Sequence, residues 1–291
     1  MLKIDPVQTP TKDFHQFMLG AVAPRPIAFV SSLSPEGVPN LAPYSFFNAF
    51  SSNPPILVFS SNRRVENNTT KDTLRNAQET GELVINVVSH HIARQMALAS
   101  IEYGPEIDEF EMAGFTKLPS ERVKPYRVAE SPVQMECVVD RIIPLGESAG
   151  AGHLIVCRIL LMHIQEEVLT PTGRIDPHKI DLMGRMGRFW YARASGAAIE
   201  EIVQPVNVIG MGFPGLPESI RISPILSGAD LAELAALPAL PDKGSAASLL
   251  AEDPEAARAL AEGRDALHLY IKAALAARDI PRAAKAAALA T

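Results

Sequence analysis

The two longest strand-like runs of the sequence lie next to each other, and they constrain the fold more than any other feature. Residues 133–143 alternate in part between apolar and polar side chains, and residues 153–166 are apolar on both faces over most of their length. A flexible Gly- and Ala-rich connection, residues 146–152, joins them. A strand with two apolar faces is covered on both sides, either inside the fold or at an interface between subunits.

Shorter strand-like segments precede this pair and are separated by short turns. Residues 25–32 and 41–50 flank the sequence SPEG at 34–37, which has the composition of a tight turn and predicts a hairpin. Residues 56–59 and 83–88 have the apolar, β-branched composition of buried strands. Strands at this density, with few helices between them, predict a mainly β fold with helices, built as an antiparallel barrel rather than as a βαβ sheet.

The stretch 40–73 contains the residues that point to a ligand. The sequence SSNRR at 60–64 follows a predicted strand, and a helix is predicted over 70–80 with Gly81 as its C-terminal stop. Hydroxyls, guanidinium groups, a lysine and free helix N–H groups can together hold a phosphate. The apolar segment 44–50 offers a wall for a planar ring, so a flavin mononucleotide (FMN) suits both features. The same residues would also suit a strand pair followed by a solvated loop and a surface helix.

Three separated motifs resemble one known family. They are RPIAFVSS at 25–32, NLAPYSFFNAF at 40–50 and KDTLRNAQETGELVINVV at 71–88. They occur in the order found in the flavin reductase-like, FMN-binding split-barrel family, the group that includes nitrilotriacetate monooxygenase component B and flavoredoxin. The resemblance covers about residues 10–195. It implies a split β-barrel with FMN against the first hairpin, working as a homodimer with the flavin near the subunit interface.

The resemblance also implies which residues bind FMN. Those expected to contact the isoalloxazine ring, largely through backbone groups, are Ser45, Phe46, Phe47 and Asn48. Those expected within reach of the ring or the ribityl chain are Ser31 and Ser32. The candidates for the phosphate and ribityl contacts are Ser60, Asn62, Arg63, Lys71 and Thr73.

His153 is the candidate for contact with a nicotinamide. Several branches of the family have Gly-Asp-His at the start of the late strand, and this sequence has Ala151-Gly152-His153. The histidine is kept and the aspartate is absent. No other protein acid or base is predicted to be catalytic, because hydride transfer to a bound flavin needs alignment more than proton transfer.

These features lead to one main functional hypothesis and two alternatives. The main one is an FMN-dependent NAD(P)H:flavin oxidoreductase that supplies reduced flavin to a partner monooxygenase. The first alternative is a non-enzymatic FMN-binding electron carrier like flavoredoxin, which the missing aspartate before His153 favours. The second is an assembly module in which the flavin site is vestigial. No P-loop, strand-linked G-x-G-x-x-G or G-x-S-x-G motif is present, so a separate dinucleotide domain is not predicted.

Charge and cysteine usage exclude several other classes. The net charge of −6, with basic residues scattered along the chain, argues against nucleic-acid binding. Cys137 and Cys157 each lie inside an apolar run, which argues against a disulfide framework or a zinc site. His90-His91 has no metal-ligand spacing, so no metal is predicted. Without a signal peptide or a membrane-length apolar run, the expected location is the cytoplasm.

The composition changes at about residue 200, which predicts two domains. Residues 1–199 would form the FMN-binding split barrel, and residues 200–291 a Gly/Pro-rich linker, centred on 206–217, and an alanine-rich helical extension. Alanine, leucine and charged residues at this density favour helix, and prolines would divide the extension into three or four helices. The extension contains no catalytic constellation. Its expected role is structural packing, with partner docking or a lid over the site as alternatives.

Overall fold

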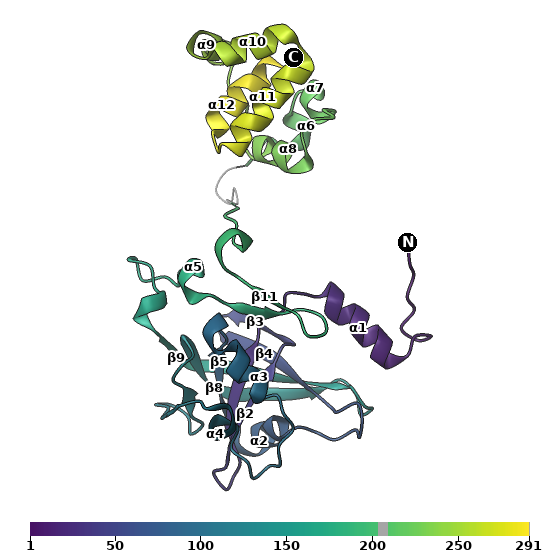
Figure 1. Cartoon of the computed structure of the whole chain (residues 1–291), viewed down its shortest axis with the longest axis vertical. Coiled ribbons are helices and arrows are strands. Elements are labelled where there is room, and N and C mark those ends of the chain that lie inside the picture. Colours follow the sequence, from purple (N-terminus) through teal and green to yellow (C-terminus); the bar gives the residue numbers. More distant parts are fainter. Residues whose placement is uncertain (203–208, 291) are drawn as a thin grey trace. The chain divides into compact units, whose positions relative to one another are not determined.

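A computed structural model describes residues 1–202 and 209–290 (Figure 1). The chain divides into two compact units, residues 1–200 and residues 201–291. Part of the predicted linker, residues 206–208, lies outside the described residues.

The first unit is built on one antiparallel sheet of seven strands. In sheet order the strands are β2 (Pro39–Tyr44), β1 (Ala28–Leu33), β5 (Glu82–Val87), β8 (Val133–Pro144), β9 (Gly152–Ile164), β4 (Pro55–Asn62) and β3 (Phe47–Ser52). Two short ribbons accompany the sheet, β6 (Lys117–Leu118) with β7 (Arg127–Val128) and β10 (Met183–Arg185) with β11 (Tyr191–Arg193). The two long strands predicted at 133–143 and 153–166 form, and this pair, β8–β9, runs through the middle of the sheet.

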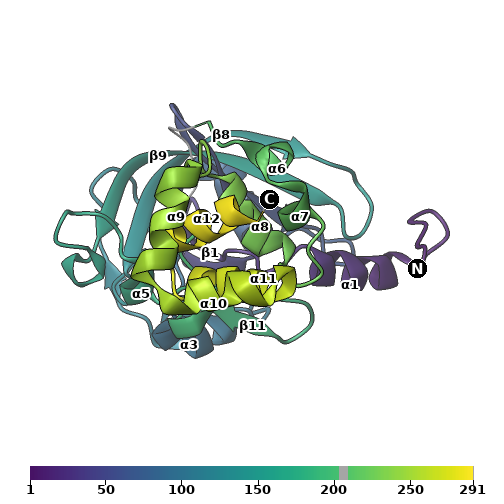
Figure 2. The same ribbon diagram turned by 90° about the horizontal axis from the view of Figure 1, so that it is seen from above.

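The first unit also contains short helices. They are α1 (Thr11–Ala21), α2 (Asp72–Thr80), α3 (Ala93–Leu98), α4 (Glu109–Ala113) and α5 (Pro177–Ile180), with single 3₁₀ turns at His90–Ile92, Glu166–Val168 and Gly196–Ala198. The predicted stop of α2 is confirmed, because Gly81 adopts the left-handed conformation that glycine allows at a helix C-terminus. Figures 1 and 2 both show α1, in purple, extending away from the strands, and none of its residues is buried.

The predicted hairpin at the N-terminus forms, but its second half is different. β1 pairs with β2 across the turn at 34–37, where Gly37 has a φ of +88°. The prediction of one strand over 41–50 is wrong, because the chain bends at Ser45-Phe46 and continues as β3. β2 pairs with β1 at one end of the strand order, whereas β3 pairs with β4 at the other end. A single turn therefore joins the two edge strands, which rolls the sheet into the predicted split β-barrel.

Two apolar clusters hold the first unit together, one on each side of β1. The inner cluster fills the barrel and includes Phe59, Ile85 and Cys157. The outer cluster packs α3 and α4 against the sheet and includes Phe29 and Phe110. Cys157 and its neighbour Cys137 are free, buried thiols, and burial raises the pKa of Cys137 to about 12, so they act as apolar core residues.

The second unit is helical, as predicted. It contains α6 (Gly212–Gly215), α7 (Glu218–Arg221), α8 (Gly228–Ala235), α9 (Lys243–Glu252), α10 (Pro254–Glu262), α11 (Arg264–Ala276) and α12 (Ile280–Leu289). Buried alanines of α12 allow it to pack closely among α8, α9 and α11. From α8 onward there are five helices, one more than the upper prediction, because Gly263, with a φ of +109°, separates α10 from α11 without a proline.

Candidate functional site

A small cavity lies beside the edge strand β2, where α2 begins. Its volume is about 80 Å³, enough for roughly two or three water molecules or one phosphate group. It is lined by two predicted site residues, Lys71 and Thr73, and by polar or charged side chains from other segments, chiefly Tyr44, Arg64, Glu102 and Glu109.

Lys71 is the positive group of this cavity that lacks a counter-ion. Its Nζ lies 5.4 Å from the centre of the Tyr44 ring, and no carboxylate in residues 1–202 or 209–290 forms an ion pair with it. Burial, and then the positive charge of Arg64, lower the pKa of Lys71. No side chain caps the N-terminus of α2, so its first N–H groups add a further positive potential. A bound anion would relieve the cost of partly removing this cation from water.

The two adjacent arginines have different surroundings. Arg64 lines the cavity, donates to Thr69 Oγ1 at 3.0 Å and pairs with Glu102 at 2.8 Å. The predicted phosphate ligand Arg63 instead donates to the side chain and backbone oxygen of Asn68, inside its own loop. The cavity therefore contains Arg64 of the predicted SSNRR segment, and not Arg63, the arginine of that segment named as a phosphate ligand.

Ser32 and Thr73 meet in a buried polar network behind the cavity. Asn40 Nδ2 donates to Ser32 Oγ at 3.2 Å and to Thr73 Oγ1 at 2.8 Å, and Asn76 Nδ2 donates to Ser32 Oγ at 3.1 Å. These bonds fix the start of α2 against β1 and β2. Ser31 is also buried, but it points to the other face of β1 because neighbouring strand residues alternate.

Two buried hydroxyls close to the cavity lack partners. Within the part of the chain that the structure describes, neither Tyr44 Oη nor Ser61 Oγ makes a hydrogen bond of ordinary geometry. Burial raises the pKa of Tyr44 to about 12, and the neighbouring hydroxyls of Thr73 and Ser61 oppose part of that rise. Buried hydroxyls without a partner are costly, so they indicate a site where a polar ligand or water belongs.

The four predicted ring contacts lie in the turn between β2 and β3, Ser45 and Phe46, and at the start of β3, Phe47 and Asn48, and the turn is held from two sides. Ser60 N–H donates to Phe46 O at 2.8 Å, and Arg25 Nε donates to Ser45 Oγ at 3.4 Å. The same buried guanidinium donates to Leu19 O at 2.7 Å and to Met186 O at 3.1 Å. Arg25 thus connects the turn to α1 and to the β10–β11 ribbon. Phe47 and Asn48 begin β3, where they pair with β4.

Ser60, Asn62 and His153 come together where β4 pairs with β9. Ser60 Oγ donates to Asn62 Oδ1 at 2.8 Å, and a Cβ added at Gly152 would lie 2.5 Å from Ser60 Oγ. His153 pairs with Ser61, and its Nδ1 lies 3.3 Å from Ser61 O. His153 is buried, with 9% of its surface exposed, so this geometry leaves little of the ring for a nicotinamide to contact.

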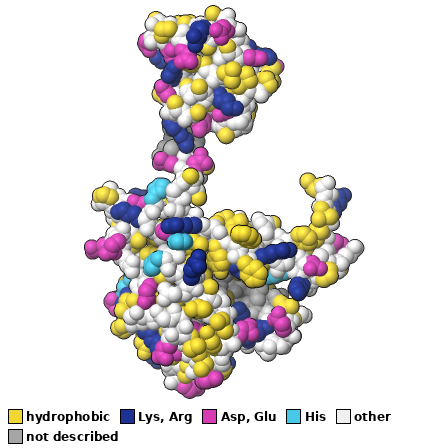
Figure 3. Space-filling model, viewed as in Figure 1, with side chains coloured by type: hydrophobic (Ala, Val, Ile, Leu, Met, Phe, Trp, Pro, Cys, Tyr) yellow, Lys and Arg dark blue, Asp and Glu magenta, His cyan; other side chains and the backbone are white. Residues whose placement is uncertain are grey.

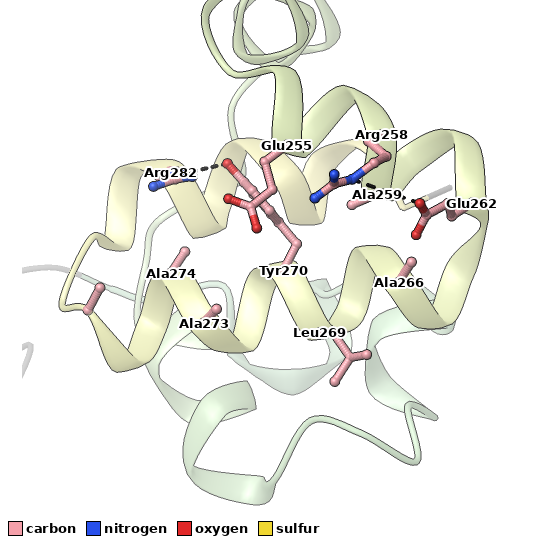
Figure 4. A pocket seen from close by; sticks show the side chains of 11 residues that line it. Glu255, Arg258, Ala259, Glu262, Ala266, Leu269, Tyr270, Ala273, Ala274 and Arg282 are labelled. Atoms are coloured by element: carbon pink, nitrogen blue, oxygen red, sulfur yellow. Dashed lines mark hydrogen bonds and ion pairs between the residues drawn. The ribbon is translucent and has the colours of Figure 1, made fainter.

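The second unit has a larger cavity without any predicted site residue. It has a volume of about 350 Å³ and lies over α10 and α11, floored by alanines (Figure 4). Figure 4 shows Glu255 and Arg258 beside Tyr270, with Arg258 paired to Glu262 at 3.8 Å. Tyr270 Oη donates to Asp253 at 2.6 Å and accepts from Arg282, so these polar groups satisfy one another.

The described residues show no sign of a charged binding surface, a membrane span or a metal site. Figure 3 shows acidic and basic side chains scattered over the face drawn, without a continuous stripe of either sign. In residues 1–202 and 209–290, no helix is long and apolar enough to cross a membrane. The same residues contain no cluster of three or more His, Cys, Asp or Glu suited to a metal ion.

Several residues of the site were not selected from the sequence. Tyr44 lies inside the quoted motif at 40–50, and Arg64 directly follows the residue that was selected. Arg25 begins the motif at 25–32, so both its position and its charge could have been noticed. Glu109 lies in an acidic segment far from the motifs, and only the packing of α4 against β2 brings it to the cavity.

Comparison with known proteins gives consistent matches. Residues 19–177 match the family described as the flavin reductase-like domain. A relative of uncharacterised function from Aquifex aeolicus is 35% identical over 189 residues, which are 65% of this chain and 94% of the relative.

Solved structures resemble the chain as well. Nitrilotriacetate monooxygenase component B from Bacillus cereus is 34% identical with a TM-score of 0.64, and the match covers 70% of this chain and 98% of that protein. A putative flavin reductase with a split-barrel domain from Shewanella frigidimarina has a TM-score of 0.59 at 20% identity, over 68% of this chain and 95% of that one. The second likeness concerns the fold alone.

Proposed function

The chain belongs to the flavin reductase-like family, and on that premise we propose that it is an FMN-dependent NAD(P)H:flavin oxidoreductase. The observation that carries the proposal is the cavity at the start of α2. Among the described residues, it combines a half-buried lysine that forms no ion pair, an arginine paired with Glu102, an uncapped helix N-terminus and a nearby hydroxyl without a partner. This donor set fits a phosphate ester.

The residues present also fit the rest of FMN. The turn at Ser45–Asn48 follows directly on Tyr44, which lines the cavity, so a ring against the turn and a phosphate in the cavity can belong to one molecule. Ser32 and Thr73 belong to the polar network at the cavity, Ser31 points to the other face of β1, and Ser60 and Asn62 lie on β4, where Ser60 bonds the turn. When bound, the flavin would accept a hydride from NADH or NADPH and pass electrons to an acceptor.

Within this proposal the protein positions groups rather than transferring protons. Arg25 and the β4 backbone hold the turn at Ser45-Phe46 in one conformation, so its backbone groups are oriented before the ring arrives. Lys71 and Arg64, which line the cavity, would hold the phosphate end.

Two further parts of the proposal concern partners and assembly. The likeness to a monooxygenase component supports a separate monooxygenase as the recipient of reduced flavin. The first unit would bind the flavin, and the protein would work as a homodimer. Residues 201–291 would be a helical extension with a structural role.

The second candidate function is an FMN-binding electron carrier, and one observation favours it. His153 is almost fully buried and its Nδ1 faces Ser61 O, which suits a structural role better than contact with a nicotinamide. A carrier would keep the phosphate site and accept electrons from a protein instead.

A binding experiment tests the premise shared by both functions. The intrinsic fluorescence of FMN and of riboflavin is titrated with the full chain, since the two ligands differ only in the phosphate. We expect FMN to bind at least tenfold more tightly than riboflavin. Equal affinity for the two ligands would refute the phosphate site, and no binding of either would refute the proposed function.

A further inference from the structure

Glu109 is an acidic residue in a cavity otherwise suited to an anion. It is buried, with 8% of its surface exposed, and its Oε2 accepts the Leu41 N–H at 3.0 Å. The other two acids that line the cavity are paired, Asp72 with Arg75 at 2.6 Å and Glu102 with Arg64 at 2.8 Å. No cation in residues 1–202 or 209–290 pairs with Glu109.

The surroundings of Glu109 favour its neutral form. Burial raises the pKa of this carboxyl to about 7, the Leu41 N–H opposes the rise, and the negative charges of Asp72 and Asp108 add to it. The same cavity is also lined by Lys71 at the start of α2, by the Arg64–Glu102 pair and by the phenols of Tyr44 and Tyr103.

A carboxylate and a phosphate cannot share this small cavity without strong repulsion, whereas a carboxylic acid can donate a hydrogen bond to a phosphate oxygen. We propose that Glu109 is a proton-linked ligand of the flavin phosphate, which binds in its protonated form and donates through the oxygen not used by Leu41. The inference rests on the proposed function. It adds a residue that adjusts affinity to pH.

The proton balance is simple. Above neutral pH the free protein holds Glu109 as a carboxylate, and binding of the phosphate dianion forms one O–H bond with a proton taken from the buffer. No electron is transferred. Phosphate binding and protonation of Glu109 are therefore linked, and each favours the other.

The experiment measures the dissociation constant of FMN between pH 7 and 9, where the phosphate of FMN is already a dianion. For the native chain we expect the constant to rise towards tenfold per pH unit above the pKa of Glu109. In Glu109→Gln the amide still accepts the Leu41 N–H and carries no titratable proton, so we expect this rise to disappear. Glu111→Gln, on the same helix but with an exposed side chain, is the matched control and should keep the native slope.

A second measurement does not depend on a variant. Calorimetric titration of the native chain with FMN at pH 8, in two buffers of different ionisation enthalpy, counts protons taken up. We expect an uptake approaching one proton per FMN, and none in Glu109→Gln. Zero uptake by the native chain, or equal pH slopes in the native chain and Glu109→Gln, would overturn the inference. If FMN fails to bind at any pH, the proposed function falls first and this inference with it.

Discussion

Replacing Lys71 by methionine separates ligand binding from folding at this site. Lys71→Met keeps the length of the side chain and its packing on the Tyr44 ring, and removes the charge. Burial and Arg64 already lower the pKa of this lysine, so the folded protein bears a cost for the charged form. The free energy of unfolding should therefore stay the same or increase.

Affinity for FMN should fall sharply in the same variant. A charge-assisted hydrogen bond is worth about 1.5–3 kcal/mol, which corresponds to roughly a 10- to 150-fold increase in the dissociation constant. Riboflavin lacks the phosphate, so its affinity should not change. A gain in stability combined with a loss of affinity is typical of a residue kept for binding.

Fluorescence titration with both ligands, and urea denaturation of the same samples, provide the assay. Lys124→Met, at an exposed lysine outside the cavity, is the control and should change neither quantity. Arg64→Met should weaken FMN binding like Lys71→Met, and Arg63→Met tests whether the sequence-predicted Arg63 binds phosphate as well. An FMN affinity for Lys71→Met within twofold of native, or an equal loss for riboflavin, would refute the phosphate site.

Three further predictions concern residues around the cavity. The pKa of Glu109 is about 7 in the folded chain, above the usual carboxyl value of 4.5, so the folded state binds more protons than the unfolded state. The free energy of unfolding of the native chain should therefore fall by up to roughly 3 kcal/mol between pH 5 and 8. Glu109→Gln should lack this pH dependence, as measured by urea unfolding followed by Trp190 fluorescence. Gly152→Ala would displace the Ser60 hydroxyl and break its bond to Asn62; we expect a loss of about 0.5–1.5 kcal/mol in FMN affinity, and unchanged titrations would contradict this contact. Asn40→Ala removes the donor to the buried Thr73 hydroxyl and one of the two donors to the Ser32 hydroxyl; it should lower the free energy of unfolding by about 1–3 kcal/mol, and an unchanged denaturation midpoint would show that the network is dispensable.

The elements of the first unit follow largely from local sequence. The alternation of residues 133–143, the turn at 34–37 and the stop at Gly81 depend on neighbouring residues, and the structure has the corresponding strand, hairpin and helix end. The predicted family is confirmed by the match over residues 19–177, and the three motifs that pointed to it could be read from local sequence. The types of these elements could therefore be predicted from the sequence.

The site depended on contacts that the local sequence does not contain. Residues 41–50 form two strands because β2 and β3 pair with different partners at opposite ends of the strand order. Arg63 and Arg64 have the same chemistry, and only the path of the loop decides which of them lines the cavity. Glu109 reaches the cavity through the packing of α4 on β2, which no pattern in its own segment indicates.

The central claim is that a flavin held in the first unit accepts electrons from a nicotinamide. It is tested most directly by mixing the FMN-loaded chain anaerobically with NADH and, separately, with NADPH, while the visible absorbance of the flavin is followed. We predict rapid bleaching with at least one donor, at a rate far above that of free FMN. A chain that binds FMN but stays yellow with both donors would contradict the reductase and leave the electron carrier.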